Sequence, residues 1–330
     1  MTPPPPPFRF ARGKDDVAFD PALGDDELIA ARAALSHGRW TDVRALLART
    51  GADWDSRGHR LVVLGEGKSA AAWAHEWQLA EPESTDAAAL SASAAVFRAA
   101  AGKQSPESAR EQCMRAARMA PGDPTPWLGL LILARRTGTD DEQVRAFDQV
   151  RGRHRGHHHA HYLMTMCLAE RQKTDGDDPF HEVYEFAEWA AGEAGAGSPL
   201  AVLPLVALVE RFRVLAEAGA LPGDPARQPY WTSARARTSL RWAFDWWLDR
   251  NGGSSGSGGG GAHGGDHPRL ALDLNYLAFG KFHSGDTVAA AALFNRIGAL
   301  ATRAPWSYRD RDPKKAFRTA RNYALGFGSS

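Results

Sequence analysis

Short signals for helix initiation recur along this chain and constrain its fold more than any other feature of the sequence. Ser105-Pro106, Ser198-Pro199 and Asp312-Pro313 each place a helix-capping residue directly before a proline, which is favoured in the first turn of a helix. Alternating, β-branched runs that are typical of strands are absent from the sequence. The pattern predicts an all-α chain with roughly thirteen to fifteen helices. Apolar residues recur at helical spacing between the initiation signals, as in Trp127, Leu130, Leu131 and Ala134.

Composition divides the chain into four segments. Residues 1–24 include a run of prolines, which fix φ and lack amide donors, so we expect a disordered, proline-rich N-terminus. Residues 25–250 carry the helical pattern. Residues 251–265 are almost entirely glycine and serine and predict a flexible linker, either natural or engineered. Residues 266–330 resume the helical pattern and are too few to rely on a core of their own, so we expect them to pack back on the main body.

Charge and cysteine content narrow the environments and partners that this chain can have. The formal net charge is +1 and the pI is near 7.9, which gives no general attraction to nucleic acid or membranes. Cys113 and Cys167 form no C-x-x-C pair, so neither a disulfide framework nor a cysteine zinc site is expected. The N-terminus lacks the layout of a secretory signal, and the longest apolar run, 200–209, is too short to span a bilayer. We therefore expect a cytoplasmic protein.

Small, aromatic and proline residues, most clearly Ala109, Cys113, Ala116, Pro121 and Trp127, repeat along the helical region at a spacing that resembles tetratricopeptide repeats. The match is degenerate, because Gln143 stands where alanine is usual and His161 replaces an opening aromatic residue. The resemblance implies an α-solenoid of stacked antiparallel helix pairs over about residues 25–250 and again over 270–304. The clearest unit consists of Ala109, Cys113, Ala116, Pro121, Trp127, Leu130, Ala134, Gly138 and Phe147, and an upstream echo consists of Trp54, Gly65, Ala70 and Pro82.

The same resemblance implies a binding surface, since such proteins usually receive a peptide in a concave groove lined by the first helix of each pair. Asparagine and lysine pairs that grip a peptide carboxylate are not evident, so a carboxylate clamp is not expected. Arg135 and Arg136 are able to engage an acidic segment. The predicted groove residues are Thr125, Leu128, Ile132, Arg135, Arg136, Tyr162, Met166, Glu170, Asn275 and Phe279.

One glycine-rich segment superficially resembles a phosphate-binding loop. Gly65-Glu66-Gly67-Lys68-Ser69 ends like the loop, but the first glycine of the motif is replaced by Val62 and no strand is expected before it. A turn between two helices is therefore the favoured interpretation.

A histidine cluster spans His154–His161. His157 and His161, four residues apart, share one helix face and are able to chelate a metal ion through imidazole nitrogens. No carboxylate partner lies nearby in the sequence, because Glu170 is more than two turns away. The favoured interpretation is a solvated, partly basic helix start with His161 packed between repeats, although metal binding stays open.

Two adjacent acids, Asp177 and Asp178, invite comparison with the aspartate-rich magnesium motif of class I terpene cyclases, which are also all-helical. The second Asn/Ser/Glu motif of those enzymes is not found after Leu200. Because Pro179 follows, Asp178 is expected to be a helix N-cap, and metal binding by the pair stays open.

These observations favour a non-catalytic interaction module or scaffold that binds another protein or peptide through its concave groove. We assign no catalytic residue, metal ligand or cofactor, and leave the oligomeric state open. Two alternatives remain, a magnesium-dependent all-helical enzyme of the class I terpene-cyclase type and a sensor of peptides or small molecules.

Overall fold

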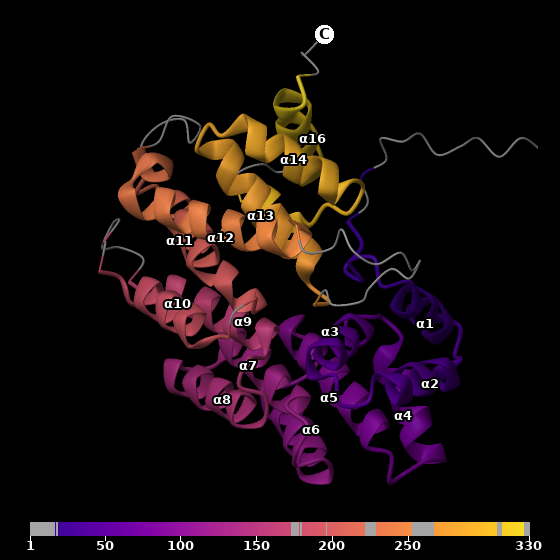
Figure 1. The fold of residues 1–330 in the computed structure, drawn as a ribbon. Helices are drawn as coiled ribbons and strands as arrows, with labels where there is room; N and C mark the ends of the chain where they lie inside the picture. Colours follow the sequence, from indigo (N-terminus) through magenta and orange to yellow (C-terminus); the bar gives the residue numbers. More distant parts are fainter. Residues whose placement is uncertain are drawn as a thin grey trace, which may run out of the picture.

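A computed structural model describes residues 17, 19–172, 178, 180–195, 197–221, 229–252, 267–308 and 312–326, with the backbone alone described for 250–252. These residues form sixteen α-helices and two short 3₁₀ helices, and no β-strand occurs among them (Figure 1). The all-α prediction is confirmed. Within the described ranges, no helix is both long and apolar enough to cross a bilayer.

The first eight helices occupy one end of the molecule, coloured indigo to magenta in Figure 1. They are α1 (Asp26–Ser36), α2 (Trp40–Thr50), α3 (Trp54–Gly65), α4 (Ala70–Ala80), α5 (Thr85–Ala100), α6 (Pro106–Met119), α7 (Thr125–Thr137) and α8 (Asp140–Arg153).

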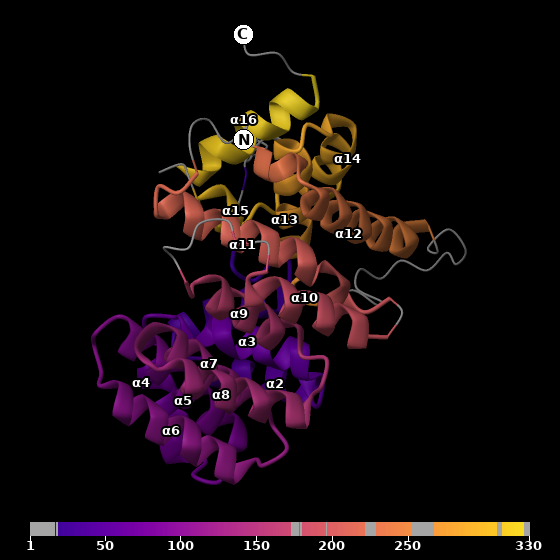
Figure 2. The same cartoon turned by 90° about the vertical axis from the view of Figure 1, so that its left-hand side faces the viewer.

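The remaining helices extend from the middle of the molecule to its other end, as Figure 2 shows from the side. They are α9 (His158–Ala169), α10 (Glu182–Glu193), η1 (Pro199–Val202), α11 (Leu203–Glu217), η3 (Pro229–Thr232), α12 (Ala234–Gly252), α13 (Leu270–His283), α14 (Thr287–Ile297), α15 (Arg303–Trp306) and α16 (Pro313–Ala324).

The helix-initiation signals in the sequence act as predicted. The side chains of Ser105 and Asp312 accept hydrogen bonds from backbone amides in the first turns of α6 and α16. Ser198 caps the short helix η1 in the same way, and the α-helix begins only at Leu203. Thr139 forms a complete capping box with Glu142 at the start of α8.

Each odd-numbered helix from α1 to α11 packs against the next odd-numbered helix, and together with α13 these helices form an inner row. The even-numbered helices from α2 to α10 each pack beside their neighbours in the chain. One helix breaks the simple order of this row. Helix α3 packs on α5, as a neighbour should, but it also contacts α7 and α9 (Figures 1 and 2). In the first half of the inner row, α3 therefore contacts the next three helices of the row and not only its neighbour, an arrangement that we call the closure of the row.

Two adjacent residues of α3 make this closure possible. A Cβ atom on Gly58 would lie only 3.1 Å from the side chains of both Leu128 in α7 and His157 before α9, so the missing side chain allows the close approach. The buried guanidinium of Arg57 pairs with Asp123 at 2.8 Å and with Asp86 at 2.7 Å. These two contacts join α3 to the loop before α7 and to α5.

Four apolar clusters fill the interior, and the largest holds together the C-terminal helices. In it, α13 packs on α11 and α12, and the rings of Phe294, Trp306 and Phe317 meet between α14, α15 and α16. Trp231 lies fully buried in η3, whereas Trp242 on α12 is 44% exposed.

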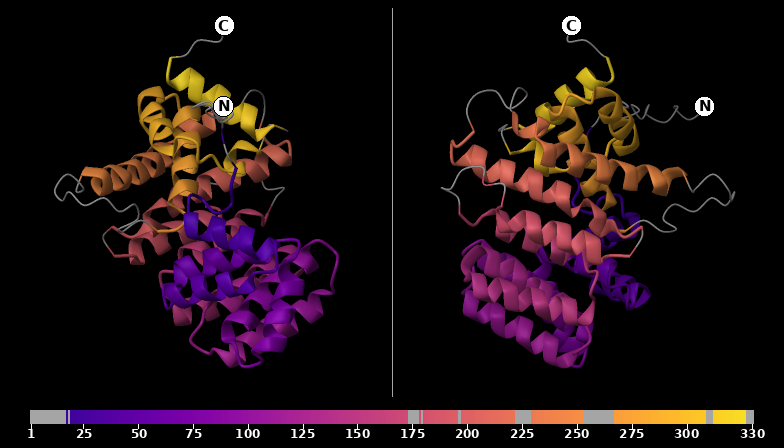
Figure 3. Two further views of the ribbon diagram at one scale, coloured as in Figure 1. Left: turned by 90° about the vertical axis from the view of Figure 1, so that its right-hand side faces the viewer. Right: turned by 60° about the vertical axis from the view of Figure 1, so that its left-hand side comes forward.

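The N-terminal segment before α1 is partly folded onto this body (Figure 3, indigo). Val17 belongs to the C-terminal apolar cluster, Ala22 is fully buried, and Asp20 pairs with Arg32. Residues 19–24, assigned from the sequence to a disordered tip, are thus ordered because their apolar side chains find partners. The proline run and residues 253–265 of the predicted linker lie outside the described residues, while Asn251 and Gly252 end α12.

Candidate functional site

Helices α3, α9 and α13 meet at a buried cluster of titratable side chains, which lies where the N-terminal helices join the C-terminal ones. We call it the histidine junction. Its members come from three separate parts of the chain and are Asp55, His59, His154, His157, His158, His159, His267, Arg269 and Asp273.

Asp55 organises the start of α9. Its carboxylate accepts the backbone N–H of His158 at 2.8 Å, which supplies from α3 the capping that α9 lacks from its own N-cap residue, His157. The same carboxylate contacts Nε2 of His154 at 2.9 Å. Burial raises the pKa of Asp55, but the His154 hydrogen bond and the neighbouring imidazoles outweigh that effect, so the pKa lies well below its usual range.

Asp273 brings two histidines together at the other side of the junction. Its Oδ2 atom lies 3.1 Å from Nε2 of His158 and 2.9 Å from Nε2 of His267, and the two imidazole centroids are 4.3 Å apart. His158 and Asp273 are each about 1% exposed in the side chain. One donor atom from each of these three residues lies within 4.8 Å of the others, a grouping able to hold a metal ion.

Burial keeps most imidazoles of the junction neutral. Desolvation lowers the pKa of His59 and of His157 to about 4, and it lowers the pKa of His159 well below the ordinary value. The pKa of His154 shifts the other way, because its hydrogen bond to Asp55 raises it.

The structure corrects our interpretation of the histidine cluster as a solvated helix start. His157, His158, His159 and His161 are all buried, and the carboxylates that contact His157 and His158 come from positions that are distant in the sequence. The ring of His161 meets Phe147 at 5.0 Å and lies near Phe186, so His161 packs in the interior against helices α8 and α10; whether these helices are repeats stays a prediction.

Asp55, His267 and Asp273 escape detection from the sequence. Each is an isolated polar residue at the end of an expected helix, where capping or solvation is the ordinary explanation. Asp273 lies 115 residues after His158, and only the path of α13 across α9 brings the two together. The spacing of His267 and Asp273 around the first turn of one helix is the only local signal.

The acidic pair gives a smaller correction. Asp177 lies outside the described residues, and Asp178 is not the N-cap of the following helix. Its Oδ1 accepts the N–H of Phe180 at 2.8 Å, whereas His181 caps α10 through Nδ1. The helix starts later than predicted because this histidine supplies the capping acceptor.

The ten predicted groove residues do not line one open surface. Two of them are paired with each other, since Arg135 and Glu170 form an ion pair at 2.7 Å that Arg213 and Glu210 extend into the interior. Ile132 and Met166 are half-buried and Arg136 is exposed. Whether any of the ten binds a partner stays a prediction. The five that are buried in the chain's own core are Thr125, Leu128, Tyr162, Asn275 and Phe279.

A surface groove of about 520 Å³ does occur between α6, α7 and α8. Apolar side chains of Met114, Trp127 and Leu130 line it, and Met114 is 36% exposed. Its polar lining includes an ion pair between Arg110 and Glu142 and the exposed side chains of Arg145, Asp148 and Gln149.

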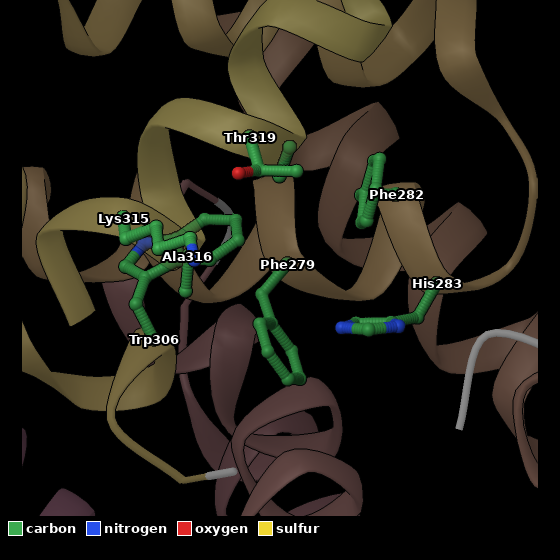
Figure 4. Close-up of a pocket in the computed structure, with 8 residues that line it drawn as sticks. Phe279, Phe282, His283, Trp306, Lys315, Ala316 and Thr319 are labelled. Carbon is green, nitrogen blue, oxygen red and sulfur yellow. The ribbon is translucent and has the colours of Figure 1, made fainter. Parts of the chain in front are cut away.

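A second cavity, of about 290 Å³, lies among α13, α15 and α16 (Figure 4). Phe279 and Phe282 of α13 and Trp306 of α15 supply aromatic walls, and His283 lies at one side. Helix α16 contributes the exposed side chain of Lys315.

Comparison with known proteins leaves these features without a relative. No family model matches the chain, and no curated protein and no solved structure is detectably similar to it.

The burial of His161 predicts a specific pH dependence of stability. Burial lowers its pKa to about 4, and this effect outweighs the hydrogen bond with the His157 backbone, which raises the pKa. Arg151 on α8, His157 at the N-cap of α9 and His158 in its first turn add to the lowering. The unfolded chain takes up this proton near pH 6.5, so stability that is present above that pH is lost as the pH falls toward 4. The free energy of unfolding of His161→Phe should therefore fall by about 2 kcal/mol less than that of the wild type between pH 7 and pH 5.

Chemical denaturation at the two pH values measures this difference. The variant His75→Gln, at an exposed position on α4, is the control and should keep the wild-type pH dependence. If the free energy of unfolding fell by the same amount between pH 7 and pH 5 in the wild type and in His161→Phe, the assignment of a neutral, buried imidazole would be contradicted.

Proposed function

We propose that this chain is a tetratricopeptide-like helical-repeat protein that binds a protein partner. The inner row of odd-numbered helices, with an adjacent helix beside most of them, supports this assignment. Spacing of small and aromatic residues supports it further, because Ala109, Cys113 and Ala116 are buried between α5, α6 and α7 as repeat positions should be.

The groove between α6, α7 and α8 carries the proposal. The predicted concave surface is a poor candidate where α3 lies against α7 and α9, because Thr125 and Leu128 there are occupied by contacts within the chain. Met114, Leu130 and Trp127 instead leave apolar surface open to solvent in a groove that is large enough for a side chain of a partner.

The chemistry of the groove defines the segment that fits it. An amphipathic partner segment would place one large apolar side chain against Met114, Leu130 and Trp127. Polar residues beside that anchor would meet Arg145 and Asp148, both exposed at the rim of the groove. Trp127 is held in place for this contact by Arg153, whose guanidinium lies 5.0 Å from the indole centroid.

A display library of random peptides tests the proposal even though the natural partner is unidentified. Peptides selected on the wild-type chain should share a large apolar residue flanked by polar ones. Met114→Glu should weaken their binding at least about tenfold, because it places a charge on the apolar contact surface. Fluorescence anisotropy with a labelled selected peptide measures the change.

Val288→Glu is the matched control, since Val288 is 82% exposed on α14 and lies outside the groove. Its affinity for the peptide should equal that of the wild type. Selected peptides that bind Met114→Glu as tightly as the wild type would show that the groove is not the binding surface.

The cavity of Figure 4 favours a second candidate, the small-molecule sensor. Aromatic walls and Lys315 suit a planar, anionic compound. Such a compound should raise the melting temperature of the wild type but not that of Ala316→Trp, in which the new ring fills the cavity. A compound that stabilises both chains equally would exclude this cavity as its site.

The magnesium-dependent enzyme has less support. Asp178 already accepts a backbone hydrogen bond next to α10, and none of the residues lining the groove or the aromatic cavity belongs to that segment.

A further inference from the structure

Three potential metal ligands converge inside the histidine junction, and neither the groove nor the repeat architecture uses them. His158 belongs to the first turn of α9, while His267 and Asp273 flank the start of α13. Asp273 Oδ2 lies 3.1 Å and 2.9 Å from the Nε2 atoms of the two histidines. All three side chains are at least nine-tenths buried.

Hydrogen bonding alone does not account for this arrangement. Nε2 of His267 is close to Asp273 Oδ2, but the ring nitrogen is not aligned with that oxygen as a hydrogen-bond donor. The other carboxylate oxygen, Oδ1 of Asp273, is buried and has no hydrogen-bond partner among the described residues. Buried polar atoms are normally partnered, so these two atoms point to a ligand.

The separations suit a tetrahedral metal centre. With metal–ligand bonds of about 2.0–2.1 Å, neighbouring ligand atoms of a tetrahedral zinc site lie about 3.3 Å apart. The two distances from Asp273 Oδ2 are 0.2 Å and 0.4 Å shorter than this value. Small movements of the imidazole rings would therefore admit an ion between the three side chains.

We infer that His158, His267 and Asp273 bind one zinc ion, which ties the start of α13 to α9. Two imidazole nitrogens and one carboxylate oxygen form a donor set that suits zinc, whereas magnesium and calcium require more oxygen ligands. A water molecule would complete the tetrahedron. Although three protein ligands and a water are also the pattern of catalytic zinc sites, the role here is structural, because the ligands are shielded from solvent and come from both sides of the glycine-rich segment.

The surrounding residues support the ligands in different ways. Asp55 fixes the position of His158 by accepting its backbone N–H, and so acts as a positioning residue. The guanidinium of Arg269 lies in the same junction and opposes a bound cation, while the Asp55 carboxylate offsets that charge. Asp273 supplies the carboxylate that contacts both histidines.

Zinc binding is tested on the full-length chain without a histidine tag, first stripped with a chelator and then titrated with zinc chloride. Isothermal titration calorimetry should give one zinc ion per chain, and the ion should remain bound through gel filtration. His267→Gln and Asp273→Asn should each lower the affinity at least about tenfold. His75→Gln, which removes an exposed histidine on α4, should leave it unchanged.

Cobalt substitution keeps the test decisive if a ligand variant fails to fold. Cobalt bound to the wild type should show the intense visible absorption of a tetrahedral centre. Absence of any retained metal, an octahedral cobalt spectrum, or zinc affinity that is unchanged in folded His267→Gln and Asp273→Asn would each overturn the inference. Unchanged zinc affinity in the folded variants would assign the binding to other histidines. Absence of retained metal would mean that hydrogen bonds alone hold the junction together.

Discussion

The close approach of α3 to α7 and α9 is the contact on which the rest of this structure depends. Gly58 favours it, because a Cβ atom at this position would lie only 3.1 Å from Leu128 and His157 and would force these side chains to shift. The approach also requires the ion pairs of Arg57, because a buried guanidinium without its carboxylates would carry an uncompensated charge. In an open solenoid α3 would contact only adjacent helix pairs, and the surface that it covers here would face solvent.

This closure explains both the loss of the predicted groove and the presence of the histidine junction. Thr125 and Leu128 are buried because α3 and its neighbours cover the start of α7. The same approach brings Asp55 to the first turn of α9, where the backbone N–H groups and the histidines need a partner. His267, just before α13, and Asp273 in its first turn then complete the junction, so the N-terminal and C-terminal helices meet through polar groups that are largely buried from solvent.

Helix content and helix starts follow from local physics, and for this reason the sequence predicts them well. Capping by Ser105 and Asp312 depends only on residues within one turn. The histidine junction depends on contacts such as that between His158 and Asp273, which are separated by 115 residues. Burial of the groove residues likewise depends on how helices distant in the sequence pack together, and the identity of Gly58 becomes informative only when its neighbours are known.

Replacing Gly58 with leucine tests the closure most directly. If α3 were exposed on an open concave face, leucine would stabilise the chain by up to about 1 kcal/mol, because it is a far better helix former than glycine. In the closed arrangement the new side chain meets Leu128 and His157, and the melting temperature should fall by several degrees. A melting temperature equal to or above that of the wild type would contradict the close packing of α3 on α7 and α9.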